Sequence, residues 1–159
     1  ASDEGVQINA VFDGHGGSRA VEHLQTSLCQ HILAEVTSKN SSDEIATIVK
    51  SAFARCDEQL KQSLMVLPPS VRMSKGYCNA GSSGSLAMTR AFGDFYLKCP
   101  ELSSAPFKSK VPYITSEPSI TTVYMDGSEK YVILASDGLW DVMTPQEAVH
   151  IVDKFGTST

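Results

Sequence analysis

The sequence predicts a single α+β domain in which helices and strands pack in layers. Two long amphipathic helical patterns lie in the first half of the chain, and β-rich runs lie before and well after them. Two of these β-rich runs lead directly into Asp-Gly turns. A chain of 159 residues suits one domain, and elements of these two kinds are combined in layered architectures.

The N-terminal half begins with an expected strand over residues 6–12, because apolar side chains recur there at every second position. A glycine-rich turn over residues 13–17 follows this strand. Apolar residues at helical spacing then predict an amphipathic helix over roughly residues 19–37. Ser41 and Glu44 form the pattern of a capping box, so we expect a second helix to begin at this point.

The second half of the chain starts with a predicted loop over residues 70–85, which is rich in Gly and Ser. Residues 120–125 and 130–135 are β-rich runs on either side of Asp126-Gly127, a pattern that predicts a β-hairpin. Thr144 is expected to cap a last helix, with Pro145 at its first position and Glu147 closing a capping box.

Charge and composition exclude several classes of protein. The chain has 13 Lys and Arg against 18 Asp and Glu, and a net charge of −5 argues against nucleic-acid binding, which needs a clustered cationic face. No apolar run approaches the ~20 residues of a membrane-spanning helix, and the N-terminus lacks the pattern of a signal peptide. We therefore expect an intracellular protein, cytoplasmic or nuclear, with no membrane span.

The four cysteines are too evenly spread to form a zinc site. No two of them form a C-x-x-C pair, although two disulfides remain arithmetically possible; the four are Cys29, Cys56, Cys78 and Cys99. Cys29 and Cys56 fall on the apolar side of helical patterns, where cysteine acts as a small hydrophobic residue. We therefore expect buried free thiols and a reducing compartment.

Two aspartates are candidate metal ligands because of their position. Asp13 and Asp137 each follow a hydrophobic β-rich run and are each followed by Gly, which lets the backbone turn sharply. If the two strands are neighbours, both carboxylates converge, and two carboxylates that converge need a cation between them or must share a proton. Oxygen ligands of this kind suit Mg²⁺ or Mn²⁺. The alternative reading is a plain turn, which we assign to Asp126.

Three longer motifs carry more information than the single aspartates. They are VFDGHGG at residues 11–17, GSLAMTRAFGD at residues 84–94 and ASDGLWDV at residues 135–142. In this order they closely resemble the motifs of the metal-dependent protein serine/threonine phosphatases of the PP2C (PPM) family. The resemblance implies a four-layer α-β-β-α sandwich, in which two antiparallel sheets are flanked by helices and the sheets are smaller than the family's.

The resemblance also implies roles for individual residues. Asp13 would bridge two metal ions, Mg²⁺ or Mn²⁺; the Gly14 carbonyl would bind one of them, and Asp137 would bind the other. His15 would act as the general acid toward the leaving alkoxide, since histidine titrates close to neutral pH. A water between the two metals would attack phosphorus in line, on phosphoserine or phosphothreonine of phosphoprotein substrates. Within the second motif, Asp94 is expected to form a structural pair with Arg90 or to support the site.

Several parts of the family's pattern are absent from the sequence. We expect residues 1–159 to be one PP2C-like domain that lacks an N-terminal segment, a central block near residues 82–84 and the C-terminal end. The absent segments would carry a phosphate-binding Arg, a Glu and a late metal-binding Asp. Three explanations stay open: a longer protein of which residues are omitted, a naturally shortened chain with weak or no activity, and a minimal enzyme completed by waters or a second chain.

Three functions therefore compete at this point. The first is a metal-dependent protein serine/threonine phosphatase, and the second is a catalytically impaired, phosphatase-like binding protein. The third is a metal-dependent hydrolase of small phosphate esters. Metal binding and substrate choice distinguish these three functions. The sequence indicates no particular oligomeric state.

Overall fold

The computed structural model describes residues 5–37, 40–73, 88–105 and 108–156. These residues divide into two compact units. The first unit comprises the described residues of the ranges 5–7 and 14–121, and the second comprises those of the ranges 8–13 and 122–156. The chain therefore passes from the first unit into the second and back again near its start, and the boundary falls inside the DGHGG motif, between Asp13 and Gly14.

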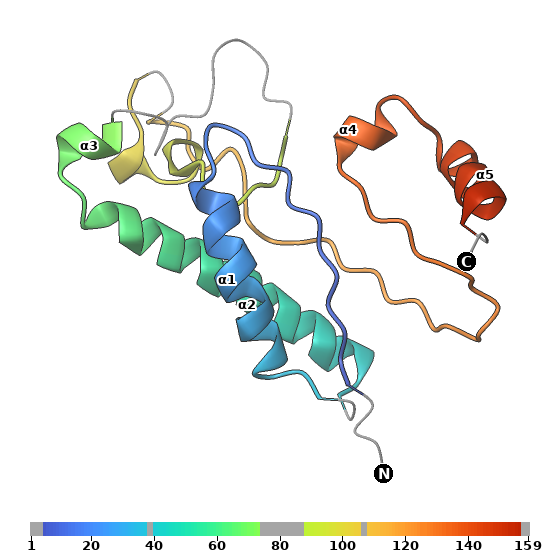
Figure 1. The fold of residues 1–159 in the computed structure, drawn as a ribbon. Helices are drawn as coiled ribbons and strands as arrows, with labels where there is room; N and C mark the ends of the chain where they lie inside the picture. The colour runs from blue at the N-terminus through green and yellow to red at the C-terminus, as the bar shows by residue number, and fades with distance from the viewer. Residues whose placement is uncertain (1–4, 38–39, 74–87, 106–107, 157–159) are drawn as a thin grey trace. The chain divides into compact units, whose positions relative to one another are not determined.

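The first unit is built on two packed helices, α1 (Arg19–Leu33) and α2 (Ser42–Met65). Figure 1 shows α1 lying across α2. Leu24 and Leu28 of α1 and a row of α2 residues are buried, as the amphipathic patterns predict. Helix α2 begins as expected, with the Ser41 side chain accepting from the Glu44 N–H and the Glu44 side chain accepting from the Ser41 N–H.

A short helix, α3 (Pro69–Met73), follows α2. The sequence predicts loop over residues 70–85, and this prediction is wrong for the part that forms α3. Pro69 occupies the first position of this helix, where proline's missing N–H costs nothing because that N–H has no intrahelical partner. The rest of the predicted loop, including the expected break near residues 82–84, lies outside the described residues.

The centre of the first unit lies where α2 meets two 3₁₀ helices, η1 (Phe95–Leu97) and η2 (Pro100–Leu102). Its buried side chains are Leu60 and Leu64 from α2 together with Phe95 and Leu102. Phe95 is only 1% exposed, so the segment after the AFGD motif is anchored in the core. Burying one aromatic side chain of this size contributes about 1.5–3 kcal/mol.

The second unit contains two helices, α4 (Asp137–Trp140) and α5 (Pro145–Phe155). Helix α5 begins as predicted, with Thr144 and Glu147 completing a capping box and Pro145 at the first position. Trp140 donates its indole N–H to the Ala135 carbonyl at 2.9 Å, which fixes the short helix against the segment before it. The SDG motif is therefore the start of a helical turn.

The expected sandwich of two antiparallel sheets is contradicted by this structure. Across the described ranges no strand or sheet is present, and the regular elements are helices; an isolated parallel bridge joins Arg90 to Thr115. Residues 6–12, 120–125 and 130–135, all predicted as strands, form no ladder with a partner segment. A strand is stable only when neighbouring backbone supplies its hydrogen bonds, and β-propensity alone cannot replace that partner.

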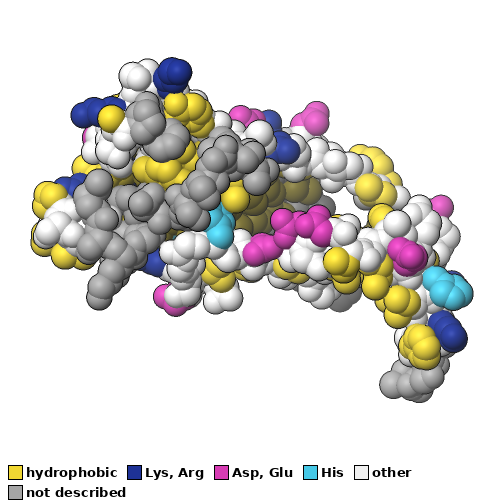
Figure 2. Space-filling view, turned by 90° about the horizontal axis from the view of Figure 1, so that it is seen from above, with side chains coloured by type: hydrophobic (Ala, Val, Ile, Leu, Met, Phe, Trp, Pro, Cys, Tyr) yellow, Lys and Arg dark blue, Asp and Glu magenta, His cyan; other side chains and the backbone are white. Residues whose placement is uncertain are grey.

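The predicted hairpin is wrong, although its turn residues do bend the chain. A bend forms at Asp126-Gly127, where Gly127 has φ of +89° and the Asp126 carboxylate accepts from the Ser128 N–H at 2.9 Å. The flanking runs do not pair, and Tyr124 and Val132 are 85% and 69% exposed. Hydrophobic side chains therefore also lie at the surface, as the yellow atoms of Figure 2 show.

Cys29, Cys56 and Cys99 are free thiols, as expected, and Cys78 lies outside the described residues. Cys56 is buried as predicted, whereas Cys29 and Cys99 are partly exposed. Burial raises the pKa of the Cys56 and Cys99 thiols, which disfavours the reactive thiolate form. Among the helices that the structure describes, none combines the length and the apolar character required to cross a bilayer.

Candidate functional site

The structure brings together side chains from two of the three motifs. His15, from the DGHGG turn, lies with its Nε2 atom 2.8 Å from Asp94 Oδ2, in the AFGD segment 79 residues later. An ionised carboxylate can only accept hydrogen bonds, so Nε2 carries the proton in this contact. The His15 side chain is 41% exposed and the Asp94 side chain 9%, so the imidazole remains accessible while its partner is fixed.

Asp94 reaches His15 because the backbone turns in a left-handed conformation. Gly93 has φ of +73°, and Asp94, with φ of +47°, is the non-glycine residue of positive φ among those described. This conformation is unfavourable for most residues other than glycine, and aspartate and asparagine adopt it more often than the others do. The turn leads straight into η1, whose buried Phe95 anchors it.

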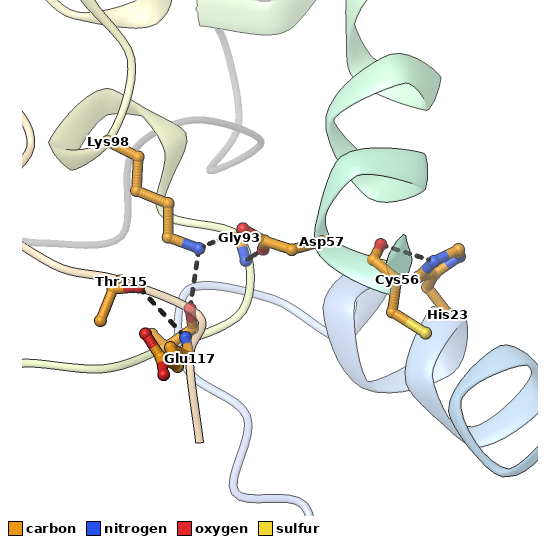
Figure 3. A network of polar contacts seen from close by, with 8 residues as sticks. His23, Cys56, Asp57, Gly93, Lys98, Thr115 and Glu117 are labelled. Atoms are coloured by element: carbon orange, nitrogen blue, oxygen red, sulfur yellow. Dashed lines mark hydrogen bonds and ion pairs between the residues drawn. The ribbon is translucent and has the colours of Figure 1, made fainter. Parts of the chain in front are cut away.

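A buried ion pair lies directly behind this turn. Asp57 of α2 accepts from the Gly93 N–H at 2.8 Å and from Lys98 Nζ at 2.6 Å. Lys98 Nζ also donates to the Ala91 carbonyl at 2.8 Å. Figure 3 shows Asp57, Gly93 and Lys98 in this arrangement. The side chains of Lys98 and Asp57 are 9% and 11% exposed, so this pair is largely removed from water.

The surroundings of this pair shift two nearby pKa values. Burial lowers the pKa of Lys98, and the nearby Asp57 and Asp94 carboxylates oppose that shift. Burial, together with the Asp94 carboxylate, raises the pKa of Tyr96. Both effects show that the Asp94 carboxylate acts electrostatically on the buried side of the turn, on Lys98 and on Tyr96.

The two predicted metal-binding aspartates both belong to the second unit. Asp13 and Asp137 are exposed, and within the part of the chain that the structure describes neither carboxylate has a hydrogen-bond or ion-pair partner. Gly14, expected to contribute its carbonyl, belongs to the first unit with His15. Nowhere in the described ranges do three or more His, Cys, Asp or Glu side chains gather closely enough to form a metal-binding group.

Other residues that the sequence singles out have structural contacts. Arg90 donates to the Ser119 hydroxyl, and the partner of the Asp94 carboxylate is His15, so the expected pair of Arg90 with Asp94 does not form. His23 and His31 are half-buried between the first two helices, where His23 contacts the Cys56 carbonyl and His31 contacts Gln59. They lie at the boundary between the helix contact and the surface.

Sequence reasoning missed Asp57 and Lys98. One signal could have found Asp57, because it lies four residues after Phe53 and three before Leu60, on the buried face of the predicted helix. A carboxylate on a buried helix face needs a cationic or hydrogen-bonding partner. Nothing in the local pattern identifies Lys98 as that partner, 41 residues along the chain.

Comparison with known proteins gives the class to which this arrangement belongs. The family model described as Protein phosphatase 2C matches residues 71–159, which is more than half of the chain. The chain is also 26% identical to "Probable protein phosphatase 2C 2" of Arabidopsis thaliana, in an alignment covering 96% of this chain and 50% of that protein. It is 34% identical to "Probable protein phosphatase 2C 68" of the same plant, covering 77% of this chain and 34% of that protein.

The chain belongs to the protein phosphatase 2C family. A relative from Oryza sativa subsp. japonica, "Probable protein phosphatase 2C 28", is 32% identical over 72% of this chain and 31% of its own length. The chain thus spans half or less of the length of these curated relatives. No solved structure matches the chain.

Proposed function

We propose that this chain acts as a metal-dependent protein phosphatase that removes phosphate from phosphoserine and phosphothreonine of phosphoprotein substrates. The observation that carries the proposal is the 2.8 Å contact between His15 and Asp94, which joins two of the family's motifs around an accessible imidazole. Membership of the protein phosphatase 2C family supports the reaction class. The net charge of −5 supports a protein rather than a nucleic-acid substrate.

The donors available in the chain fit Mg²⁺ or Mn²⁺. Asp13 and Asp137 offer exposed carboxylates with no partner among the described residues, and Gly14 offers a carbonyl oxygen. Such ions prefer oxygen ligands and are often held by one or two carboxylates together with waters and substrate phosphate oxygens. These three residues would hold the two ions that the resemblance implies. When bound, the ions would lower the pKa of a coordinated water and neutralise phosphoryl charge.

His15 supplies the proton that the leaving group needs. The serine or threonine oxygen leaves poorly as an alkoxide, so a positioned acid accelerates its departure. Because Nε2 donates to Asp94 in either charge state of the ring, Nδ1 is the nitrogen available to protonate the leaving oxygen. Asp94 thus orients the imidazole, as the carboxylate of a Ser-His-Asp triad does for its histidine.

Hydrolysis of a phosphoserine peptide tests the proposal. With Mn²⁺ added, we expect release of inorganic phosphate, and chelation by EDTA should abolish it. Asp13→Asn and Asp137→Asn should each lower kcat by about 100-fold or more. Asp126→Asn is the matched control, because Asp126 belongs to the remaining Asp-Gly pair and only forms a turn.

Other results would select a different function. Turnover that survives EDTA would contradict the metal-dependent mechanism. Absence of both turnover and Mn²⁺ binding by calorimetry would favour a phosphatase-like binding protein, and turnover of p-nitrophenyl phosphate without any phosphopeptide hydrolysis would favour a hydrolase of small esters. The location that we propose is intracellular and reducing, either cytoplasmic or nuclear. It is supported by the free thiols of Cys29, Cys56 and Cys99.

A further inference from the structure

The buried pair of Asp57 and Lys98 has no part in the proposed chemistry, yet it touches the segment that carries Asp94. Burying an ion pair costs much of what its attraction returns, so such a pair is weak evidence for stability. The pair is therefore better explained by the backbone that it holds than by a gain in stability. The two side chains make three hydrogen bonds among themselves and with the backbone of residues 91–93.

Those hydrogen bonds fix the backbone on the N-terminal side of Asp94. Asp57 holds the Gly93 N–H, and Lys98 holds the Ala91 carbonyl. On the C-terminal side, the core position of Phe95 fixes the chain. Asp94 is therefore held in its left-handed conformation, with φ of +47°. In that conformation its carboxylate lies 2.8 Å from His15 Nε2.

We infer that Asp57 and Lys98 are positioning residues for His15: they hold the Gly93-Asp94 turn in its left-handed form, and the turn in that form holds the imidazole through Asp94. Figure 3 shows Asp57 of helix α2 joined to Gly93 and to Lys98. The consequence for catalysis rests on the proposed function, in which His15 protonates the leaving oxygen. The dependence of the His15–Asp94 contact on Asp57 and Lys98 does not rest on it.

The principal variant replaces both charges. The double substitution Asp57→Asn with Lys98→Met leaves no unpaired buried charge and keeps similar volumes, so the fold should persist. The Asn side chain can still accept from the Gly93 N–H, but the Lys98 bond to the Ala91 carbonyl is lost. Lys98→Arg is the conservative variant. Arg55→Gln is the matched control, since it breaks an ion pair between α2 and Glu35, which follows α1.

The first measurement compares two substrates of different leaving-group quality. p-Nitrophenolate leaves without a proton, whereas the serine alkoxide needs one. We expect the double variant to lower kcat on the phosphoserine peptide by about 10-fold or more, while kcat on p-nitrophenyl phosphate stays within about 2-fold. In the Lys98→Arg and Arg55→Gln variants, the ratio of kcat on the peptide to kcat on p-nitrophenyl phosphate should equal that of the parent chain. Equal loss on both substrates, or no loss on either, would overturn the inference.

The second measurement is independent of activity. Nitrogen NMR of the neutral imidazole, assigned by comparison with His15→Gln, should show the Nε2–H tautomer in the parent chain, in Lys98→Arg and in Arg55→Gln. In the double variant we expect a mixture of tautomers. An unchanged tautomer in a folded double variant would overturn the inference. If the parent chain hydrolyses neither substrate, the proposed function fails, and the NMR result still decides whether Asp57 and Lys98 position His15.

Discussion

Gly14 lies beside the first turn of helix α1, where there is no room for a side chain. A Cβ atom built on Gly14 would lie 2.7 Å from Cγ2 of Val21, closer than carbon atoms approach in proteins. Val21 is β-branched and has little rotamer freedom in a helix, so it cannot simply turn away. Packing therefore requires a glycine at position 14, the first glycine of the DGHGG motif, in addition to any contribution of its carbonyl.

We predict that Gly14→Ala destabilises the chain by about 1–3 kcal/mol through overpacking against Val21. Urea denaturation followed by circular dichroism measures this change. Adding Val21→Ala should restore much of the lost stability, because it removes the methyl group that clashes. Gly5→Ala is the matched control, since a Cβ atom added there would meet no atom within 4 Å and stability should hardly change. If Gly14→Ala destabilised the Val21→Ala variant as much as it destabilises the parent chain, this explanation would be contradicted.

Single residues also show how far the sequence predicts the site. The motif makes His15 the candidate acid, and Asp94 is expected either to pair with Arg90 or to support the site. The structure shows a 2.8 Å contact between Asp94 and His15, and the catalytic role of either residue stays a prediction. The buried pair behind them was not predictable, because Asp57 and Lys98 are 41 residues apart and lie outside each other's local pattern. A helical pattern shows that Asp57 is on a buried face, but the identity of its partner depends on tertiary packing.

The start of helix α2 depends on a reciprocal pair of hydrogen bonds. The Glu44 carboxylate accepts from the Ser41 N–H at 2.7 Å, while the Ser41 hydroxyl accepts from the Glu44 N–H at 3.3 Å. We predict that Ser41→Ala lowers the free energy of unfolding by about 1 kcal/mol, because one N–H at the helix start loses its partner. Ser51→Ala, in the middle of the same helix and exposed, should be neutral or slightly stabilising. A Ser51→Ala loss as large as that of Ser41→Ala would argue against a capping effect.

The same capping box makes stability depend on pH. Hydrogen bonds from the Ser41 backbone and side chain lower the pKa of Glu44 below its ordinary value of 4.5. A carboxyl group whose pKa is lower when folded stabilises the protein above the unfolded pKa, and this contribution disappears as the pH falls through the folded value. We therefore predict that thermal stability declines as the pH falls below about 4.5, and that Glu44→Gln shows a smaller decline. An identical acid profile for the variant would contradict the assignment.

Helices and strands differ in how much of them the local sequence determines. The starts of α2 and α5 are predicted to the residue, because a capping box and an apolar stripe are both local features. The runs at residues 120–125 and 130–135 have the composition of strands and the turn residues of a hairpin, but a strand also needs a partner backbone. In this structure Gly127 makes the bend, and the runs beside it stay unpaired.

On the scale of the whole chain, the two compact units differ in how they are stabilised. The first unit holds nearly all of the buried hydrophobic side chains, including those that surround Phe95. In the second unit Ala148 is the buried hydrophobic residue among those described, and Phe155 of α5 is 65% exposed. The segment at residues 122–136 also lacks backbone ladders. The free energy of unfolding should therefore be concentrated in the first unit.

Matched substitutions in the two units test this difference. We predict that Phe95→Ala lowers the free energy of unfolding by about 3–5 kcal/mol, because it opens a cavity between α2 and η1. Phe155→Ala removes the same atoms from an exposed position, where substitutions typically change stability by less than about 0.5 kcal/mol. Chemical denaturation measures both values. Hydrogen exchange should agree, with slow amides in α1 and α2 and fast exchange at residues 122–136 because those amides lack ladder partners. Strong protection of residues 122–136, together with a large loss for Phe155→Ala, would mean that the second unit carries a core of its own.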